Sequence, residues 1–479
     1  MNKKKISTLC LLLIALFSLY QWKNAAVSVK EVEDKEAPSS TQTPVATAEI
    51  FFDNGVPVEH IMGVGKVEHP SAIALYALAY MGDDRFDDFD VVISMDYAAN
   101  CVLWLKEHAE GVGPGMKGWR YGFDNTYNDV SIQAPWYSAF GQACGIEALV
   151  CWYEKTGDEG ALNLAREAAE MLFVPIEEGG QLFISGDDIW FEEIPSKEGE
   201  PSHILNGHMR ALLALRRLYD ASGDEEVFDW YRRGVASLVH WMPLYDTGYW
   251  IRYDLNPQKS GLLFRFNNPY GEKLPELAVD EIRLEDPVSG QSAIIDVGGQ
   301  SDMKASNGNY LAGVGWQAGS LVDGHTVRRL VAVAPEPDVN TANTKPNTYF
   351  YCKLPSVWNN NLRREWLKMT IQYKDEMRGD IVMEQRSIAP DEEFVTMRDG
   401  VLSLTGSGEW RQWSVPIRPQ DLGWPVGMSY AEKHKQYLEE LFNDTSELAI
   451  WEEKSKEYFH KAKVKMGLDV VSGDVKMDE

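Results

Sequence analysis

The sequence predicts a multidomain protein in which a helical barrel, an α/α toroid, carries an inserted all-β sandwich. Three observations lead to this fold class. In residues 51–259, apolar residues recur at helical spacing in paired segments. In residues 260–425, apolar and polar residues alternate as they do in strands. Residues 426–464 return to the helical spacing. Because the last helices look like one more pair of the first block, we expect the β block to be an insertion in a loop of the barrel.

The N-terminus has the pattern of a targeting segment. Three lysines, residues 3–5, precede an apolar run over residues 9–20, which is short for a membrane-spanning helix. We assign residues 1–25 to a signal peptide or a membrane anchor. The basic flank predicts that the rest of the chain is exported, either secreted or anchored. Residues 26–50, rich in Lys, Glu, Ser, Thr and Pro, are expected to be a linker.

The first helical block is expected to consist of helix hairpins. Short turns such as Thr156-Gly157-Asp158 and Ser222-Gly223-Asp224 separate segments that are apolar on one broad stripe. Aromatic-rich loops gather at one end of these hairpins, which favours a toroid. A helical solenoid is the alternative, although no repeat of fixed period is present. The predicted helices are 71–80, 97–108, 136–155, 161–172, 205–221 and 227–242.

The β block is punctuated by Gly, Asn, Asp and Pro, which favours a sandwich. Its predicted strands are 280–286, 292–297, 367–373, 380–385, 400–404 and 410–417. Asp286, Asp296 and Asp302 are candidate ligands for a structural calcium ion, and no other cofactor is expected. Helices are predicted again at 430–442 and 446–461, and residues 465–479 are a polar tail.

Composition narrows the possible partners. The formal net charge is −27, which makes nucleic acid and anionic membrane surfaces unfavourable partners. The 16 tryptophans favour a carbohydrate cleft, where flat rings stack on sugar faces, although tryptophan is also ordinary core material. The five cysteines include no CxxC pair, so we expect buried thiols, with a long-range disulfide left open. The sequence contains no metal-binding signature of the HExxH or clustered Cys/His type.

One stretch combines features of an acid–base site. Glu192 and Glu193 follow Trp190 and Phe191 and come shortly before a predicted helix. A carboxylate held among apolar groups acquires a raised pKa, as a general base near neutral pH requires. A solvated acidic loop is the alternative in so acidic a chain.

Three segments, residues 188–196, 203–209 and 242–255, resemble the D-glucuronyl C5-epimerase of heparan sulfate biosynthesis. The resemblance covers roughly residues 52–256 and 429–460. Weaker support comes from Gly55-Val-Pro-Val58, His69-Pro70, Gly118-Trp119 and Trp136-Tyr-Ser-Ala139 with Gln142. It implies an α/α barrel with β domains, an anionic polysaccharide substrate and a homodimer.

The resemblance also implies site residues. Glu193 and Tyr253 match positions implicated in catalysis, and Tyr430, followed four residues on by His434, matches a further tyrosine. The chain departs from the family at three positions. Ile194 stands where the family has tyrosine, Asn256 where it has arginine, and His69 where it has an early tyrosine.

Epimerisation at C5 of glucuronate removes a proton next to a carboxylate and returns one from the opposite face. Glu193 suits one face and Tyr430 the other, with Tyr253 nearby and His434 one helical turn from Tyr430. A cation must neutralise the substrate carboxylate. The candidates for this cation are Arg252, Arg120 and His208, and the other expected substrate contacts are Glu192, Trp190, Tyr137 and His69.

Other functions share parts of this pattern. A polysaccharide lyase forms the same carbanion but expels the 4-O substituent, and toroids combined with sandwiches are typical of lyases. A non-catalytic glycan-binding protein would explain Ile194 and Asn256. A glycoside hydrolase is a weaker alternative.

Overall fold

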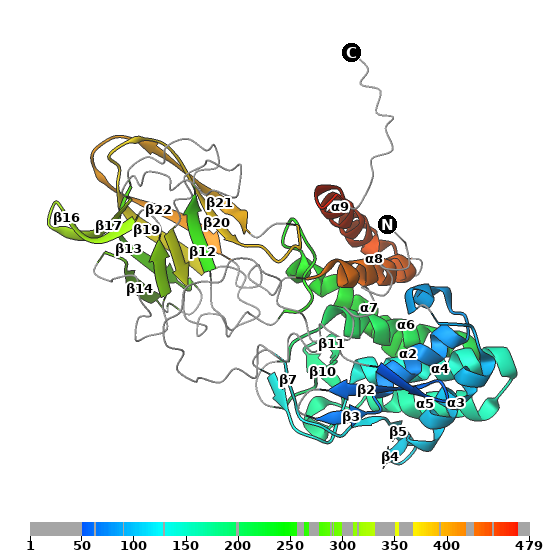
Figure 1. Ribbon diagram of the computed structural model, residues 1–479. Coiled ribbons are helices and arrows are strands. Elements are labelled where there is room, and N and C mark those ends of the chain that lie inside the picture. Colours follow the sequence, from blue (N-terminus) through cyan, green and yellow to red (C-terminus); the bar gives the residue numbers. More distant parts are fainter. Residues whose placement is uncertain are drawn as a thin grey trace. The chain divides into compact units, whose positions relative to one another are not determined.

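The chain divides into two compact units, which are described separately. The first runs to Asp246 and includes Gly427–Phe459, and the second comprises Thr247–Val426 and the chain from His460. The computed structural model (Figure 1) describes residues 50–61, 64–89, 91–127, 130–197, 201–255, 263–267, 277–287, 290, 292–298, 310–313, 316–330, 350–353, 367–391, 394–417, 426–442 and 445–467. The expected targeting segment, most of the linker, Asn256, Asp302 and residues 468–479 lie outside these ranges.

Helices build most of the first unit, close to where the sequence predicts them. They are α2 (Pro70–Tyr80), α3 (Met95–Glu107), α4 (Ala139–Thr156), α5 (Glu159–Leu172), α6 (Leu205–Ser222), α7 (Glu225–Tyr245), α8 (Met428–Phe442) and the start of α9 (Ala449–Lys465). Within the unit, α2 packs against α4, α4 against α6, and α6 against α8. The partners α3, α5 and α7 pack against α2, α4 and α6 in turn.

The Gly-Asp turns have a simple physical basis. Gly157 ends α4 with φ +74°, and Gly223 ends α6 with φ +66°, the left-handed conformation that glycine adopts without strain. The next residue in each turn, Asp158 or Asp224, accepts a hydrogen bond from a backbone N–H in the first turn of the following helix. One dipeptide therefore stops a helix and starts the next.

The predicted helix at 136–155 is corrected at its N-terminal end. Residues Trp136–Tyr137 form a strand, β9, and Ser138 caps α4 by accepting a hydrogen bond from the Gly141 N–H at 3.3 Å. Short ladders of this kind surround the helices and were not predicted. They are β1 (Ile50–Asp53), β2 (Val56–Ile61), β3 (Gly65–Val67), β4 (Glu110–Gly113), β5 (Met116–Gly118), β6 (Arg120–Tyr121), β7 (Asn125–Tyr127), β8 (Val130–Ile132), β10 (Leu182–Ser185) and β11 (Asp188–Phe191).

The second unit contains two antiparallel sheets. One has the strand order β15-β18-β12-β20-β21, and the other has the order β16-β17-β13-β19-β22 with β14 paired to β13. One apolar cluster includes residues of both sheets, such as Ile282 and Ile371 from one and Ile381 and Met383 from the other. The strands are β12 (Leu263–Asn267), β13 (Ala278–Glu285), β14 (Ser292–Asp296), β15 (Tyr310–Gly313), β16 (Trp316–Val322), β17 (His325–Leu330), β18 (Phe350–Lys353), β19 (Leu367–Lys374), β20 (Arg378–Arg386), β21 (Phe394–Thr405) and β22 (Trp410–Ile417).

The sequence predicts β13, β14, β19, β20 and β22 close to their observed bounds. The strand predicted at 400–404 is the end of the longer β21. The sequence missed β12 and β15–β18. Of these, β15 and β18 are only four residues long, too short for an alternating pattern to stand out.

Within the described ranges, the helices of the first unit carry buried cysteines. There, Cys101, Cys144 and Cys151 are buried free thiols, and burial raises the pKa of Cys101 and of Cys144 to about 12. No cluster of three potential metal-ligating side chains occurs among the described residues. In the same ranges, no helix combines the length and the hydropathy that crossing a bilayer requires.

A buried carboxylate closes the turn between β21 and β22. Asp375 accepts hydrogen bonds from the backbone N–H of Thr405 and Gly406 and from the hydroxyl of Ser407. Burial alone would raise the pKa of Asp375, but these hydrogen bonds outweigh burial and lower it. Since the folded-state pKa is depressed, the stabilisation is present above pH ~4 and is lost as pH falls through the folded-state value.

We expect Asp375→Asn to lower the free energy of unfolding of the β unit by about 3 kcal/mol at neutral pH, because several charge-assisted hydrogen bonds are lost. The deficit should shrink in acid, because the carboxylate of the unfolded wild-type chain then takes up a proton before that of the folded chain does. Urea denaturation at pH 7 and pH 3 measures both values. Asp323→Asn is the control, since Asp323 is an exposed partner of Lys374 and should cost less than about 1 kcal/mol. Equal losses in the two variants would contradict the role of Asp375.

Candidate functional site

A β-hairpin delivers the paired carboxylates to the N-terminal ends of α4 and α6. β11 pairs with β10, and the chain then leaves the hairpin at Glu192. The backbone of Glu192 is held on both sides. Its N–H donates to the Gln181 carbonyl at 2.8 Å, and its carbonyl accepts from the Ala139 N–H, the first residue of α4, at 3.1 Å. The next residue, Glu193, is therefore positioned by backbone contacts rather than by a mobile loop.

The two carboxylates have different environments. Glu192 is completely buried. Its Oε1 lies 2.5 Å from Nδ1 of His203, and its Oε2 accepts from the His203 N–H at 3.2 Å. Glu193 is only half-buried. This placement favours a structural role for Glu192, which clamps the segment before α6, over the substrate contact expected from sequence.

Glu193 lies against Gly207 in the first turn of α6. A Cβ at position 207 would stand 2.8 Å from Oε2 of Glu193 and 2.9 Å from its Cβ. Only glycine leaves room for the carboxylate there. The Asn206-Gly207 pair thus permits a close approach of a catalytic candidate to the helix.

Trp190 and His208 form a buried aromatic stack beneath the hairpin. Their ring centroids are 3.8 Å apart, and the Trp190 ring also stacks on Trp241 and Tyr245. Nδ1 of His208 accepts from the Phe191 N–H at 3.0 Å, so Nε2 carries the proton and donates to the Gly234 carbonyl at 3.1 Å. Trp190 is fully buried, so this placement favours a packing role for it.

Burial lowers the pKa of His208 to about 3, so this ring is neutral at physiological pH. Burial without an acidic partner disfavours the charged imidazole, so this placement favours a packing role for His208 over the expected role as a cation. His434 in α8 is buried in the same way, and burial lowers its pKa to about 3 as well. Tyr430, one turn earlier in α8, is half-buried.

Arg120 and Tyr137 face each other across the β6–β9 ladder. Arg120 is exposed and pairs with Glu110 at 3.2 Å. The opposite face of the same ladder was not singled out from the sequence. It carries Tyr121 and Trp136, which are buried and stacked with centroids 4.4 Å apart. The alternation of side chains along a strand was the available signal, but a two-residue strand is too short to show it.

His69 lies beside this buried pair. Its ring meets the Tyr121 ring edge-on, with centroids 4.8 Å apart, and its Nδ1 lies 2.8 Å from the Ser71 hydroxyl. Burial lowers the pKa of His69, a change that the charge of Glu59 partly offsets. The structure thus brings Glu193, His69 and Tyr121 into one unit.

Tyr253 and Arg252 belong to the second unit, in the segment Thr247–Leu255. Both side chains are buried. Arg252 folds back on its own segment, where Nε donates to the Asp254 carbonyl at 2.7 Å. The Asp254 carboxylate lies 3.7 Å from the same guanidinium.

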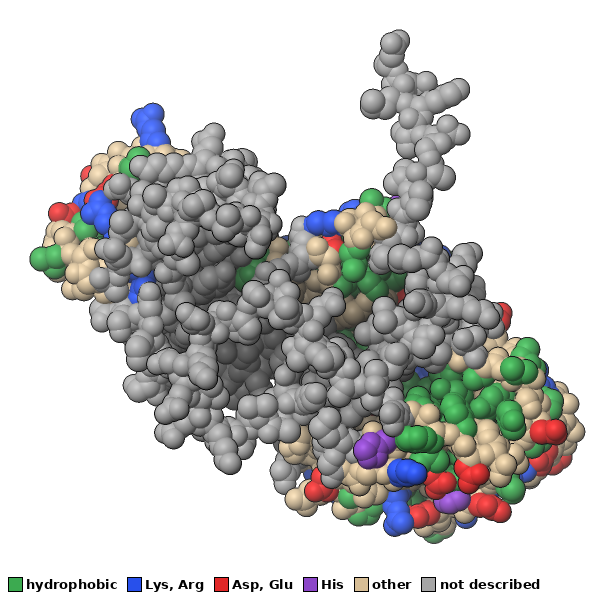
Figure 2. Space-filling view, viewed as in Figure 1, with side chains coloured by type: hydrophobic (Ala, Val, Ile, Leu, Met, Phe, Trp, Pro, Cys, Tyr) green, Lys and Arg blue, Asp and Glu red, His purple; other side chains and the backbone are tan. Residues whose placement is uncertain are grey.

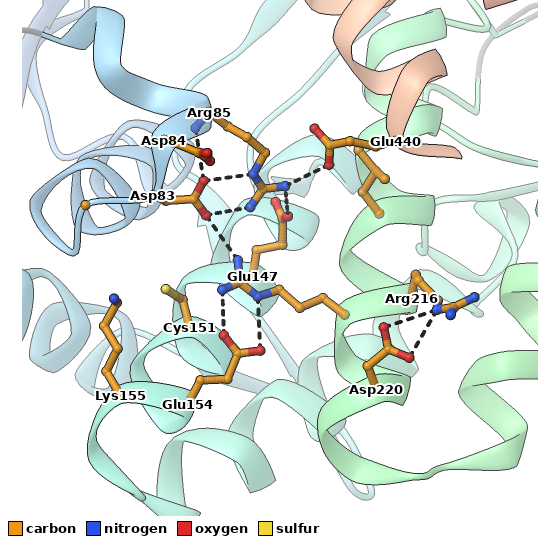
Figure 3. Close-up of a pocket in the computed structure, with 13 residues that line it drawn as sticks. Asp83, Asp84, Arg85, Glu147, Cys151, Glu154, Lys155, Arg216, Asp220 and Glu440 are labelled. Carbon is orange, nitrogen blue, oxygen red and sulfur yellow. Dashed lines mark hydrogen bonds and ion pairs between the residues drawn. The ribbon is translucent and has the colours of Figure 1, made fainter. Parts of the chain in front are cut away.

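A separate polar pocket of about 800 Å³ lies toward the C-terminal ends of α4 and α6 (Figure 3). Its arginines are paired with its acids. Arg85 contacts Asp83 at 2.7 Å and Glu147 at 2.8 Å, and Arg217 contacts Glu154 at 2.6 Å. Behind the pocket, the buried Arg210 pairs with Glu147. Ala139 and Glu154 are fifteen residues apart on α4, so this pocket is roughly 20 Å from the Glu193 end.

Charges of both signs are also mixed at the surface. On the face of the helical unit seen in Figure 2, hydrophobic side chains are bordered by acidic and basic ones. No basic patch dominates the described part of that face, as expected for a net charge of −27.

Comparisons with solved structures show only weak similarity. Cellobiose 2-epimerase from Spirochaeta thermophila is 16% identical, with a TM-score of 0.26, over 36% of this chain and 44% of that one. Cellobiose 2-epimerase from Bacillus thermoamylovorans is 15% identical, with a TM-score of 0.26, over 39% and 46%. TM-scores this low do not establish a shared fold.

Sequence comparisons are more specific. The chain is 31% identical over 169 residues to the D-glucuronyl C5-epimerase of Caenorhabditis elegans, which is 32% of this chain and 26% of the relative. It is 35% identical over 141 residues to an uncharacterized protein of Methanocaldococcus jannaschii, which is 28% of this chain and 44% of the relative. The chain thus spans less than half the length of these relatives. The family model for the D-glucuronyl C5-epimerase C-terminus matches residues 115–266, which include Glu193, Gly207 and Tyr253. The segment of residues 115–266 thus bears out the resemblance to the D-glucuronyl C5-epimerase family.

Proposed function

We propose that this protein is a uronate C5-epimerase that converts D-glucuronate to L-iduronate within a heparosan-like polysaccharide. The observation that carries the proposal is the environment of Glu193. Of two adjacent carboxylates, Glu192 is buried and engaged with His203, whereas Glu193 is half-buried against Gly207 inside the matched family segment. A base used in catalysis must be reachable by substrate, and of the two carboxylates only Glu193 belongs to a partly exposed side chain.

The proposed reaction has two proton transfers. The Glu193 carboxylate removes the C5 proton from one face of the uronate, leaving an enolate-like dianion. Tyr430 returns a proton to the opposite face. The half-buried position of Tyr430 in the first turn of α8 is compatible with this role. His434 is neutral at pH 7 and is assigned a packing role behind Tyr430.

The proposal also covers the architecture of each of the two units. We propose an α/α toroid whose inner helices are α2, α4, α6 and α8, since each packs against the next and each of the first three carries an outer partner. We likewise propose that the two sheets of the second unit form a sandwich, supported by the apolar cluster that they share.

The direct test is incubation with N-acetylated or N-sulfated heparosan in deuterated water, read by NMR. Deuterium at C5 together with a changed ratio of glucuronate to iduronate is the expected result. An unsaturated, ultraviolet-absorbing product would instead identify a lyase. Binding without deuterium incorporation and without an unsaturated product would contradict the proposal for this glycan.

Gly207→Ala is expected to reduce deuterium incorporation by ~100-fold, because the added methyl group displaces the Glu193 carboxylate and a displacement near 1 Å costs about that much. The fold should survive, since alanine favours a helix over glycine by about 1 kcal/mol. Exchange rate and thermal midpoint are measured together. Gly160→Ala in α5 is the matched control, because its Cβ would meet nothing closer than 3.2 Å. An unchanged exchange rate in Gly207→Ala would mean that Glu193 does not work from this position.

A further inference from the structure

Residue 194, next to the proposed base, is an isoleucine and offers no hydroxyl to the substrate. Ile194 is buried, with 4% of its surface exposed. An enolate-like intermediate needs hydrogen-bond donors aimed at its developing charge. A hydroxyl from another part of the chain could meet this need if it lay at the same end of α4 and α6 as Glu193.

Tyr121 satisfies this condition. Its hydroxyl lies over Gly141 in the first turn of α4, so close that a Cβ at position 141 could not be accommodated. Two residues earlier, the Ala139 N–H holds the carbonyl of Glu192, which directly precedes Glu193. The phenol and the Glu193 carboxylate thus approach the same helix terminus. Burial, with a contribution from the charge of Glu193, raises the pKa of Tyr121, so the phenol keeps its proton.

The Tyr121 hydroxyl is also connected to a second ionisable group. It hydrogen-bonds the Ser71 hydroxyl, which in turn lies 2.8 Å from Nδ1 of His69. Ser71 is buried, and the His69 ring packs edge-on against the Tyr121 ring. If His69 carries its proton on Nδ1, then Nδ1 donates to the Ser71 hydroxyl, and the Ser71 hydroxyl donates to the Tyr121 oxygen. Each member then polarises the next, and the phenolic O–H becomes a stronger donor.

We propose that Tyr121 donates a hydrogen bond to the carboxylate of the bound uronate, where charge accumulates as C5 loses its proton, and that Ser71 and His69 orient and strengthen this donor. Tyr121 thereby supplies the hydroxyl that Ile194 lacks. This inference rests on the proposed function. Tyr121 would be a catalytic residue, and Ser71 and His69 would be positioning residues. No proton leaves Tyr121, so the two transfers assigned to Glu193 and Tyr430 are unaffected.

The first test compares the exchange kinetics of two buried tyrosines with heparosan in deuterated water. Tyr121→Phe is expected to lower kcat by ~100-fold with little change in KM, because the hydroxyl acts on charge that develops only as C5 loses its proton. Ser71→Ala should lower kcat by about tenfold, since it interrupts the donor chain. Tyr76→Phe is the control. Tyr76 is buried in α2 among Phe52, Tyr80 and Phe89, and its loss should leave kcat unchanged. A wild-type kcat in Tyr121→Phe would overturn the inference.

The second test does not require turnover. In protein labelled with 15N-histidine, NMR is expected to show His69 as the Nδ1–H tautomer, with an Nδ1 resonance that moves in Ser71→Ala. The Nε2–H tautomer would overturn the donor chain whether or not the wild-type protein acts on heparosan. The Nδ1–H tautomer in a wild-type protein that shows no exchange would contradict the proposed function and leave the donor chain supported.

Discussion

Glu193→Gln is expected to reduce deuterium incorporation at C5 by at least ~1,000-fold, the upper part of the range for losing a positioned general base. Glutamine keeps the size and the hydrogen-bonding ability of the side chain but cannot accept the C5 proton. Because Glu193 is half-buried rather than sealed in the core, the folded state should persist. NMR of the polysaccharide in deuterated water measures the rate, and circular dichroism reports the fold.

The neighbouring carboxylate provides the matched control. Glu192→Gln removes the charge that His203 contacts inside the protein, so this variant should lower the thermal midpoint while the molecules that remain folded still exchange C5 hydrogen. The two substitutions are chemically identical and one residue apart. If Glu192→Gln abolished exchange without affecting stability while Glu193→Gln remained active, the roles of the two residues would have to be interchanged.

Glu147→Gln is expected to cost about 3–5 kcal/mol of folding free energy, the largest stability effect that the described structure predicts for one side chain. Glu147 pairs with Arg210, and both side chains are completely buried; it also contacts Arg85 at 2.8 Å. Without the carboxylate, the Arg210 guanidinium stays buried without its acidic partner, with the faces of Phe86 and Tyr437 beside its charge. Chemical denaturation followed at the helical circular dichroism band measures the loss.

Two further variants separate a buried pair from a surface pair. Glu154→Gln, on the same helix, removes a carboxylate that is 42% exposed and pairs with Arg217, and should cost less than about 1 kcal/mol. The double variant Glu147→Leu with Arg210→Met replaces the pair by apolar groups and should recover much of the loss, because neither charge then remains buried. A double variant no more stable than Glu147→Gln would show that packing, not charge, dominates this position.

Local patterns predicted the helices well because their causes are local. The Gly157-Asp158 and Gly223-Asp224 turns place a left-handed C-terminal residue beside an N-terminal cap, and neither function depends on a distant partner. The start of α4 is the instructive exception. The apolar run at Trp136-Tyr137 continues the helical pattern, but it pairs with Arg120-Tyr121, and Ser138 begins the helix instead. Strand partners fifteen and seventeen residues away cannot be inferred from the run itself.

In the candidate site, too, local patterns predicted some features, and partners distant in the sequence decided others. The Trp-Phe-Glu-Glu segment directed attention to Glu192 and Glu193 together, since both are acids beside apolar residues. Only their partners separate them: His203 occupies Glu192, and Gly207 makes room for Glu193. His208 was a candidate cation by residue type, yet its burial against Trp190 keeps it neutral.

The sequence by itself determined the resemblance to a known family, the helix hairpins and their turns, and the pair of acids that contains the proposed base. These features depend on residue type and short spacing. Tertiary structure decided which acid is accessible, which histidines are neutral, and that Tyr121, Ser71 and His69 meet near Glu193. The physical reason is that accessibility, charge state and donor direction depend on burial and on partners distant in the chain, which no local pattern encodes.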